Sequence, residues 1–238
     1  FLTCADGARV WTNNGAADFG DSGQRLGHAS GYRVALGDLN GDGDLDAFIA
    51  TAGLGDPDEV WINDGSGHFA DSGLRLGLSE TTAVQLGDLD GDGDLDAYVG
   101  GLGREETWLN DGTGTNFVFG SRCSPILIGV AMDADIGDLN GDGRADAFAT
   151  TMYGGMDYAA INDGTGTNFA RSRQAAMQPS NAVRLGDLDG DGDLDTFQCG
   201  MKTNVVWINS GGTGTASVVG AVPGGYGHGV DLGDLESA

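Results

Sequence analysis

Aspartate or asparagine recurs at alternate positions in four nearly identical, glycine-containing loops. They read GDLNGDGDLD at 37–46, GDLDGDGDLD at 87–96, GDLNGDGRAD at 137–146 and GDLDGDGDLD at 186–195. Alternate spacing turns the side-chain oxygens towards one point, and the glycine at the sixth position, counted from the first aspartate, permits a sharp turn. An all-oxygen donor set without His or Cys favours calcium over zinc or copper. Several carboxylates on a flexible loop also favour calcium over magnesium.

The first, third, fifth and ninth positions supply the predicted side-chain ligands. The seventh position is predicted to contribute its backbone carbonyl, because the third loop has Arg144 there and a guanidinium cannot ligate a cation. A fifth copy starts at Asp234, but Glu236 and Ser237 break the pattern, so we expect about four calcium ions. The predicted ligands are Asp38, Asn40, Asp42, Asp44 and Asp46; Asp88, Asp90, Asp92, Asp94 and Asp96; Asp138, Asn140, Asp142, Arg144 and Asp146; and Asp187, Asp189, Asp191, Asp193 and Asp195.

Two other interpretations of these loops are weaker. An EF-hand requires Glu at position 12 and flanking helices, whereas the four loops have Ile49, Val99, Ala149 and Gln198 there and strand-like flanks. The EF-hand is therefore rejected. The other interpretation is a set of Asp-Gly turns that hold no metal, and the repetition of one ligand pattern in four loops argues against it.

The loops recur with a regular period that defines the fold. Their first aspartates, and Asp234, are spaced by 50, 50, 49 and 47 residues, which indicates a repeat architecture. One unit predicts short strands at 34–36, 47–50 and 60–62 and a fourth beginning at 68, with a hairpin turn at 63–65. No segment shows helical periodicity. Four short antiparallel strands per repeat predict an all-β protein, a β-propeller with four-stranded blades.

The two ends of the chain predict how many blades there are. Residues 1–4 align with the second strand at 48–51, and residues 230–234 match a first strand. We therefore expect one domain over 1–238 with five blades, the last shared between the termini. The repeats are 1–29 with 228–238, then 30–79, 80–129, 130–179 and 180–227. A fragment of a larger ring is the alternative, since the chain starts inside a repeat.

Charge and hydropathy narrow the possible partners. The 238 residues include 36 acidic and 11 basic side chains, a net charge of −25, which argues against nucleic acid. No apolar run approaches the roughly 20 residues of a membrane helix, and no signal peptide is visible. We expect no membrane insertion.

Each repeat resembles the FG-GAP or VCBS repeat of integrin-α-type β-propellers, in which D-x-[DN]-x-D-G-x-x-D loops bind calcium between the first two strands of a blade. The resemblance covers essentially the whole chain, although such propellers often have seven blades. It implies extracellular binding and adhesion modules, lectins among them, and domains appended to secreted enzymes. It does not imply one activity.

Other residue types that carry chemistry form no catalytic pattern. Trp11, Trp61, Trp108 and Trp207 share one strand position, which favours packing between blades over sugar stacking. The three histidines occupy non-equivalent positions and are read as solvated. Cys4 and Cys199 are predicted on neighbouring blades, where two free thiols and a disulfide both remain open. We expect no enzymatic activity.

The connections on the rim opposite the acidic loops differ between repeats, which makes them the expected ligand site. Tyr153, Met156, Arg104 and Lys202 are the candidates there, although drift explains the variation equally well. The preferred hypothesis is a calcium-stabilised recognition or adhesion module, secreted or at a cell surface, that binds glycan or protein. The alternatives are a propeller domain, catalytic or not, of a secreted polysaccharide-degrading enzyme, and a structural spacer in a repetitive surface protein.

Overall fold

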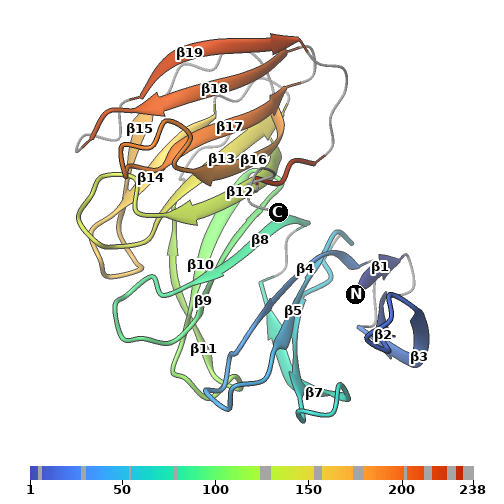
Figure 1. Ribbon diagram of the computed structural model, residues 1–238. Coiled ribbons are helices and arrows are strands. Elements are labelled where there is room, and N and C mark those ends of the chain that lie inside the picture. Colours follow the sequence, from blue (N-terminus) through green and yellow to red (C-terminus); the bar gives the residue numbers. More distant parts are fainter. Residues whose placement is uncertain are drawn as a thin grey trace.

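The computed structural model describes residues 1–4, 7–27, 31–53, 55–77, 80–123, 130–152, 157–173, 180–200, 203–211, 216–223 and 229–232. These residues are all-β and contain no helix, and therefore no helix long and apolar enough to cross a membrane. Nineteen strands form five antiparallel sheets (Figure 1).

Each sheet is built from strands that follow one another in the chain. Sheet 1 contains β1 (Leu2–Cys4), β2 (Gly7–Asn13) and β3 (Phe19–Leu26). Sheet 2 contains β4 (Gly31–Gly37), β5 (Asp46–Thr51), β6 (Asp58–Asn63) and β7 (Phe69–Leu76). Sheet 3 contains β8 (Thr81–Gly87), β9 (Asp96–Gly101), β10 (Arg104–Asn110) and β11 (Phe117–Arg122). Sheet 4 contains β12 (Val130–Gly137), β13 (Asp146–Met152), β14 (Tyr158–Asn162) and β15 (Phe169–Arg173). Sheet 5 contains β16 (Ser180–Gly186), β17 (Asp195–Gly200), β18 (Thr203–Asn209) and β19 (Ala216–Pro223).

The repeat pattern predicted the strands of sheet 2 correctly. The expected strands at 34–36, 47–50 and 60–62 lie inside β4, β5 and β6, and the strand expected from residue 68 is β7. Every residue of β5 is buried, because both faces of the sheet are covered by neighbouring sheets. Each complete sheet therefore has the form of a propeller blade.

The sheets pack side by side in chain order, with their first strands adjacent: β4 contacts β8, β8 contacts β12, and β12 contacts β16. Four apolar clusters fill the four seams between consecutive sheets. In the first strands, Asp133 is almost fully buried and pairs with Arg33 of β4 at 3.2 Å and with Arg184 of β16 at 3.1 Å. This ion-pair network links sheets 2, 4 and 5.

The strand expected at 230–234 is described only in part. Residues 230–232 form no strand, and 233–234 lie outside the described residues. The physical reason is the absence of a pairing partner: β1 pairs with β2 only, and sheet 1 has three strands. The segment nevertheless lies beside sheet 5, because the Leu232 side chain lies within van der Waals reach of Gly186. Leu86, Ile136 and Leu185 pack in the same way on Gly37, Gly87 and Gly137.

Most of the repeated aromatic residues belong to the core. Phe48, Tyr98 and Phe148 are fully buried, and Trp61 and Trp108 pack against the seam clusters as predicted. Trp11 differs, with 40% of its surface exposed.

The predictions for the thiols and histidines can be checked only in part. Cys123 and Cys199 are free buried thiols, so Cys199 is not in a disulfide. His68 is solvated as expected, whereas His28, His228 and the Cys4 side chain lie outside the described residues.

Candidate metal centres

The acidic loops are pre-organised by hydrogen bonds from their own backbone. In the first loop the Asp38 carboxylate accepts the N–H groups of Gly41 at 2.8 Å, Asp42 at 3.1 Å and Gly43 at 2.9 Å. The glycines make this turn possible, since Gly41 and Gly43 have φ of 74° and 91°, values that other residues rarely adopt. Asp88, Asp138 and Asp187 accept equivalent bonds in the other three loops. The four loops therefore share one conformation.

The aspartate at the ninth position joins each loop to the hairpin turn of its own sheet. Asp46 is fully buried, and its two oxygens accept the N–H of Leu39 at 2.9 Å and the N–H of Asn63 at 2.8 Å. Burial raises the pKa of Asp46, and raises those of Asp96 and Asp146 to about 6, against the opposing effect of these backbone hydrogen bonds. A nearby cation would favour the ionised form of these carboxylates.

Carboxylates from the predicted ligand sets converge in two loops. Oxygens of Asp88, Asp90 and Asp96 lie within 4.8 Å of one another, as do those of Asp187, Asp189 and Asp195. Asp92 and Asp191, at the fifth position, do not belong to these groups. The first and third loops have Asn40 and Asn140 at the third position, and each amide donates to the carboxylate at the fifth position.

The seventh-position side chains contact the hairpin turns, and Arg144 also lies 3.8 Å from the Asp142 carboxylate of its own loop. Those of Asp44, Asp94, Arg144 and Asp193 lie against the hairpin-turn glycines Gly65, Gly112, Gly164 and Gly211. In the third loop the Arg144 guanidinium donates to the Asp163 carbonyl at 2.9 Å. Ligation by the seventh position through its backbone carbonyl stays a prediction.

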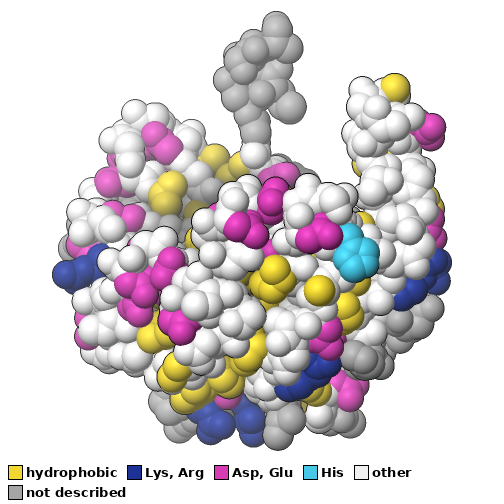
Figure 2. Space-filling model, turned by 90° about the horizontal axis from the view of Figure 1, so that it is seen from below, with side chains coloured by type: hydrophobic (Ala, Val, Ile, Leu, Met, Phe, Trp, Pro, Cys, Tyr) yellow, Lys and Arg dark blue, Asp and Glu magenta, His cyan; other side chains and the backbone are white. Residues whose placement is uncertain are grey.

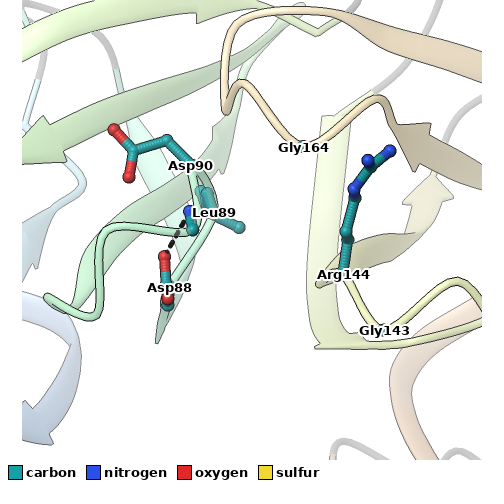
Figure 3. Close-up of a pocket in the computed structure, with 7 residues that line it drawn as sticks. Asp88, Leu89, Asp90, Gly143, Arg144 and Gly164 are labelled. Carbon is teal, nitrogen blue, oxygen red and sulfur yellow. Dashed lines mark hydrogen bonds between the residues drawn. The ribbon is translucent and has the colours of Figure 1, made fainter.

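A cleft of about 300 Å³ separates the second and third loops (Figure 3). Asp88 and Asp90 lie on one side, and Arg144 and Gly164 lie on the other. Acidic side chains also form several separate groups on the face seen from below (Figure 2). Among the described residues, none of the six converging carboxylates forms an ion pair with a basic side chain. A set of oxygen donors without a protein counter-charge fits a calcium ion.

The hairpin-turn asparagines are site residues that the motif analysis did not identify. The side-chain amides of Asn110, Asn162 and Asn209 donate to Leu39, Leu89 and Leu139 in the acidic loop of the preceding sheet, at 2.8, 2.7 and 2.8 Å. The signal for this role was present in the sequence, since an asparagine starts the hairpin turn of every repeat.

The rim opposite the loops is only partly described. Arg104 is exposed at the start of β10, whereas Tyr153, Met156 and Lys202 lie outside the described residues. Three buried acids lie at the start of the third strands of sheets 2, 3 and 4: Asp58 begins β6, Glu105 is the second residue of β10, and Asp157 precedes β14. Burial raises the pKa of each to about 7.

Sheets 2 to 5, each with an aspartate-rich loop between its first two strands, define a repeat protein of β-propeller type. The model of the FG-GAP-like repeat matches three overlapping segments, 38–99, 88–149 and 138–198. The chain belongs to this family of FG-GAP-like repeat proteins. No curated protein sequence matches the chain.

Several solved structures are similar to this one. BBS1N, solved in complex with ARL6DN, has a TM-score of 0.55 at 13% identity over 81% of this chain and 56% of its own, a likeness that shows the fold alone. A lectin of Agrocybe aegerita that recognises non-reducing terminal N-acetylglucosamine has a TM-score of 0.43 at 20% identity, over 93% of this chain and 75% of its own. The Tc holotoxin pore of Photorhabdus luminescens has a TM-score of 0.44 at 19% identity, over 92% of this chain and 11% of its own. This chain thus spans little more than half of BBS1N and a small part of the holotoxin chain.

Proposed function

We propose that the protein is a calcium-stabilised extracellular recognition module without catalytic activity of its own. The calcium proposal rests on two groups of three carboxylates whose oxygens converge, and none of these carboxylates has a basic partner among the described residues. The groups are Asp88, Asp90 and Asp96, and Asp187, Asp189 and Asp195. Family membership supports the same assignment, and we propose one calcium ion in each of the four loops. At millimolar calcium and a Kd near 10⁻⁴ M, each ion would add about 1.4 kcal/mol to the free energy of unfolding.

The proposed ligand is a glycan or a protein bound on the rim opposite the acidic loops. That rim carries the connections that differ from repeat to repeat, including the exposed Arg104, while the loops and hairpin turns are nearly invariant. A rigid scaffold with variable loops is the usual arrangement of a binding module. We propose an extracellular location because the resemblance to integrin-α-type propellers implies one, and because millimolar calcium outside cells would fill loops of low affinity.

We further propose that the chain forms a five-bladed propeller whose last blade is shared between the two ends. Sheet 1 has three strands and lacks only the first. Leu36 and Leu45, next to the place of that strand, are 43% and 55% exposed, although the equivalent Leu86 and Leu95 of sheet 3 both lie against Gly37. Residues 230–234 would supply that first strand.

A glycan array probed in 2 mM calcium chloride and again in EDTA tests the recognition proposal, with hydrolase and lyase assays on the same polysaccharides alongside it. Calcium-dependent binding without turnover is the expected result. Turnover would support the polysaccharide-degrading alternative. No binding on the glycan array or on an array of extracellular matrix proteins would support the alternative of a structural spacer.

A further inference from the structure

The four acidic loops differ in charge, although they share one conformation. At the five predicted ligand positions the second and fourth loops carry five carboxylates each, and the first loop carries four because Asn40 replaces one. The third loop carries three, because Asn140 and Arg144 replace two, and Arg144 adds a positive charge. The formal charge of these positions is therefore −5 in the second and fourth loops, −4 in the first and −2 in the third.

The positions of the oxygens also distinguish the loops. The structure describes every residue of the four loops, and three carboxylates converge within 4.8 Å in the second and the fourth but not in the first and the third. In the latter two loops the amides of Asn40 and Asn140 donate to Asp42 at 2.9 Å and to Asp142 at 3.1 Å. These two loops therefore offer a cation fewer anionic oxygens.

The Arg144 side chain is held beside a predicted ligand of its own loop. Its guanidinium lies 3.8 Å from Oδ2 of Asp142 and donates to the Asp163 carbonyl at 2.9 Å. The side chain also lies against Gly164, so the hairpin turn fixes its position. The oxygen that faces the guanidinium is the one that accepts the Asn140 amide. A cation in the third loop would therefore compete with two donors for this oxygen.

The charge of Arg144 acts mainly on the third loop. The residue also borders the cleft opposite Asp88 and Asp90 (Figure 3), but among the described residues no ion pair joins it to either of them. Asp42, the counterpart of Asp142 in the first loop, has no ion pair with a basic side chain in the described part of the chain. In EF-hand loops the Kd for calcium ranges from about 10⁻⁹ to 10⁻³ M, and ligand charge count and rigidity set it.

We propose that Arg144 makes the third loop the weakest calcium site of the chain, so that this loop fills after the other three and acts as the calcium-responsive member of the set. The proposal rests on calcium binding as proposed above and adds an order of loading. The second and fourth loops load first, then the first loop, and the third loop last. Occupancy in sheet 4 therefore changes with calcium concentration in a range where the other three loops are already filled.

Native mass spectrometry of the chelated protein, titrated with free calcium from about 1 μM to 5 mM, tests the order of loading across the range of sensor and extracellular sites. The last ion should need at least roughly tenfold more free calcium than the third. Asp138→Ala removes the first ligand of the third loop and should abolish only that last step. Asp187→Ala should instead abolish one of the early steps. Loss of an early step in Asp138→Ala would overturn the proposal.

Substitutions at the seventh position test the role of Arg144 without changing a side chain that is predicted to ligate. Arg144→Asp gives the third loop the residue found in the other three and should lower the calcium midpoint of the last step by roughly tenfold or more. Arg144→Lys keeps the charge and should leave that step late. An unchanged midpoint in Arg144→Asp, or an equal shift in Arg144→Lys, would overturn the assignment to the charge of Arg144.

The reciprocal variant Asp44→Arg places the same charge in the first loop. Asp44 lies against Gly65 as Arg144 lies against Gly164, so the two positions are matched. This variant should create a second late ion, and a single late ion would contradict the proposal. Thermal melts in EDTA show that each variant folds. A chain that binds no calcium would overturn both the calcium proposal and this one, whereas four ions that bind in one step would overturn only the order of loading.

Discussion

The substitution Asp96→Asn separates two roles of the ninth loop position, which are to hold the loop on the hairpin turn and to bind the cation. Asp96 is fully buried, and its oxygens accept the N–H groups of Leu89 at 2.9 Å and Asn110 at 2.8 Å. The asparagine keeps the shape and one acceptor, but its amide nitrogen faces one of the two backbone donors. It also removes a negative charge from the predicted calcium site.

The expected magnitude depends on whether calcium is present. Without calcium, an unpaired buried N–H costs about 1–3 kcal/mol. Removal of the buried charge offsets part of that cost, because burial raises the pKa of Asp96 to about 6. With 1 mM calcium and a Kd near 10⁻⁴ M, loss of the site removes a further contribution of about 1.4 kcal/mol. The destabilisation by Asp96→Asn should therefore be about 1.4 kcal/mol larger in calcium than in EDTA. The hydrogen-bond contributions are the same in both solutions and cancel in this difference.

Urea unfolding at pH 7.5, followed by tryptophan fluorescence in 1 mM calcium chloride and in EDTA, measures this difference. Asp94→Asn is the matched control, since it removes the same charge from the same loop while its side chain lies against Gly112. The control should show a much smaller calcium-dependent loss than Asp96→Asn. Equal losses for Asp96→Asn in both solutions would refute the ligand role of the ninth position.

Three further perturbations test the fold. Burial raises the pKa values of Asp58, Glu105 and Asp157 to about 7, so the folded state binds their protons more tightly than the unfolded state. The free energy of unfolding should fall as the pH rises from about 4.5 to 7.5, and Asp58→Asn should flatten that slope in urea titrations at several pH values. Ala17 has a φ of 59°, so Ala17→Gly should raise the free energy of unfolding by about 1 kcal/mol in urea titrations. Asp133→Ala leaves the guanidiniums of Arg33 and Arg184 without their buried partner. It should lower the free energy of unfolding, measured by urea titration, by about 3 kcal/mol.

The repeat made the strands and the loops predictable from the sequence. Each loop is a local structure in which Asp38 and its equivalents bind N–H groups three to five residues ahead, so the pattern of aspartates and glycines is enough to define it. The same locality explains why strands β4 to β7 agree with the expected ranges.

Contacts between distant parts of the chain were not predictable in the same way. The contact between Asp46 and Asn63 joins residues 17 apart in the sequence, and the contact between Asn110 and Leu39 joins residues 71 apart. No local sequence pattern predicts either contact. Residues 230–232, the described part of the strand expected at 230–234, form no strand for a related reason, because a first strand needs a pairing partner from the other end of the chain.

Calcium binding is tested most directly by native mass spectrometry of the chelated protein titrated with calcium, with thermal melts of the same samples. We predict four calcium ions per chain, each lost when the first aspartate of its loop is replaced by alanine, and a Tm that rises with each ion bound. A chain that binds no calcium at 2 mM and melts at the same temperature in EDTA would contradict the calcium-stabilised propeller.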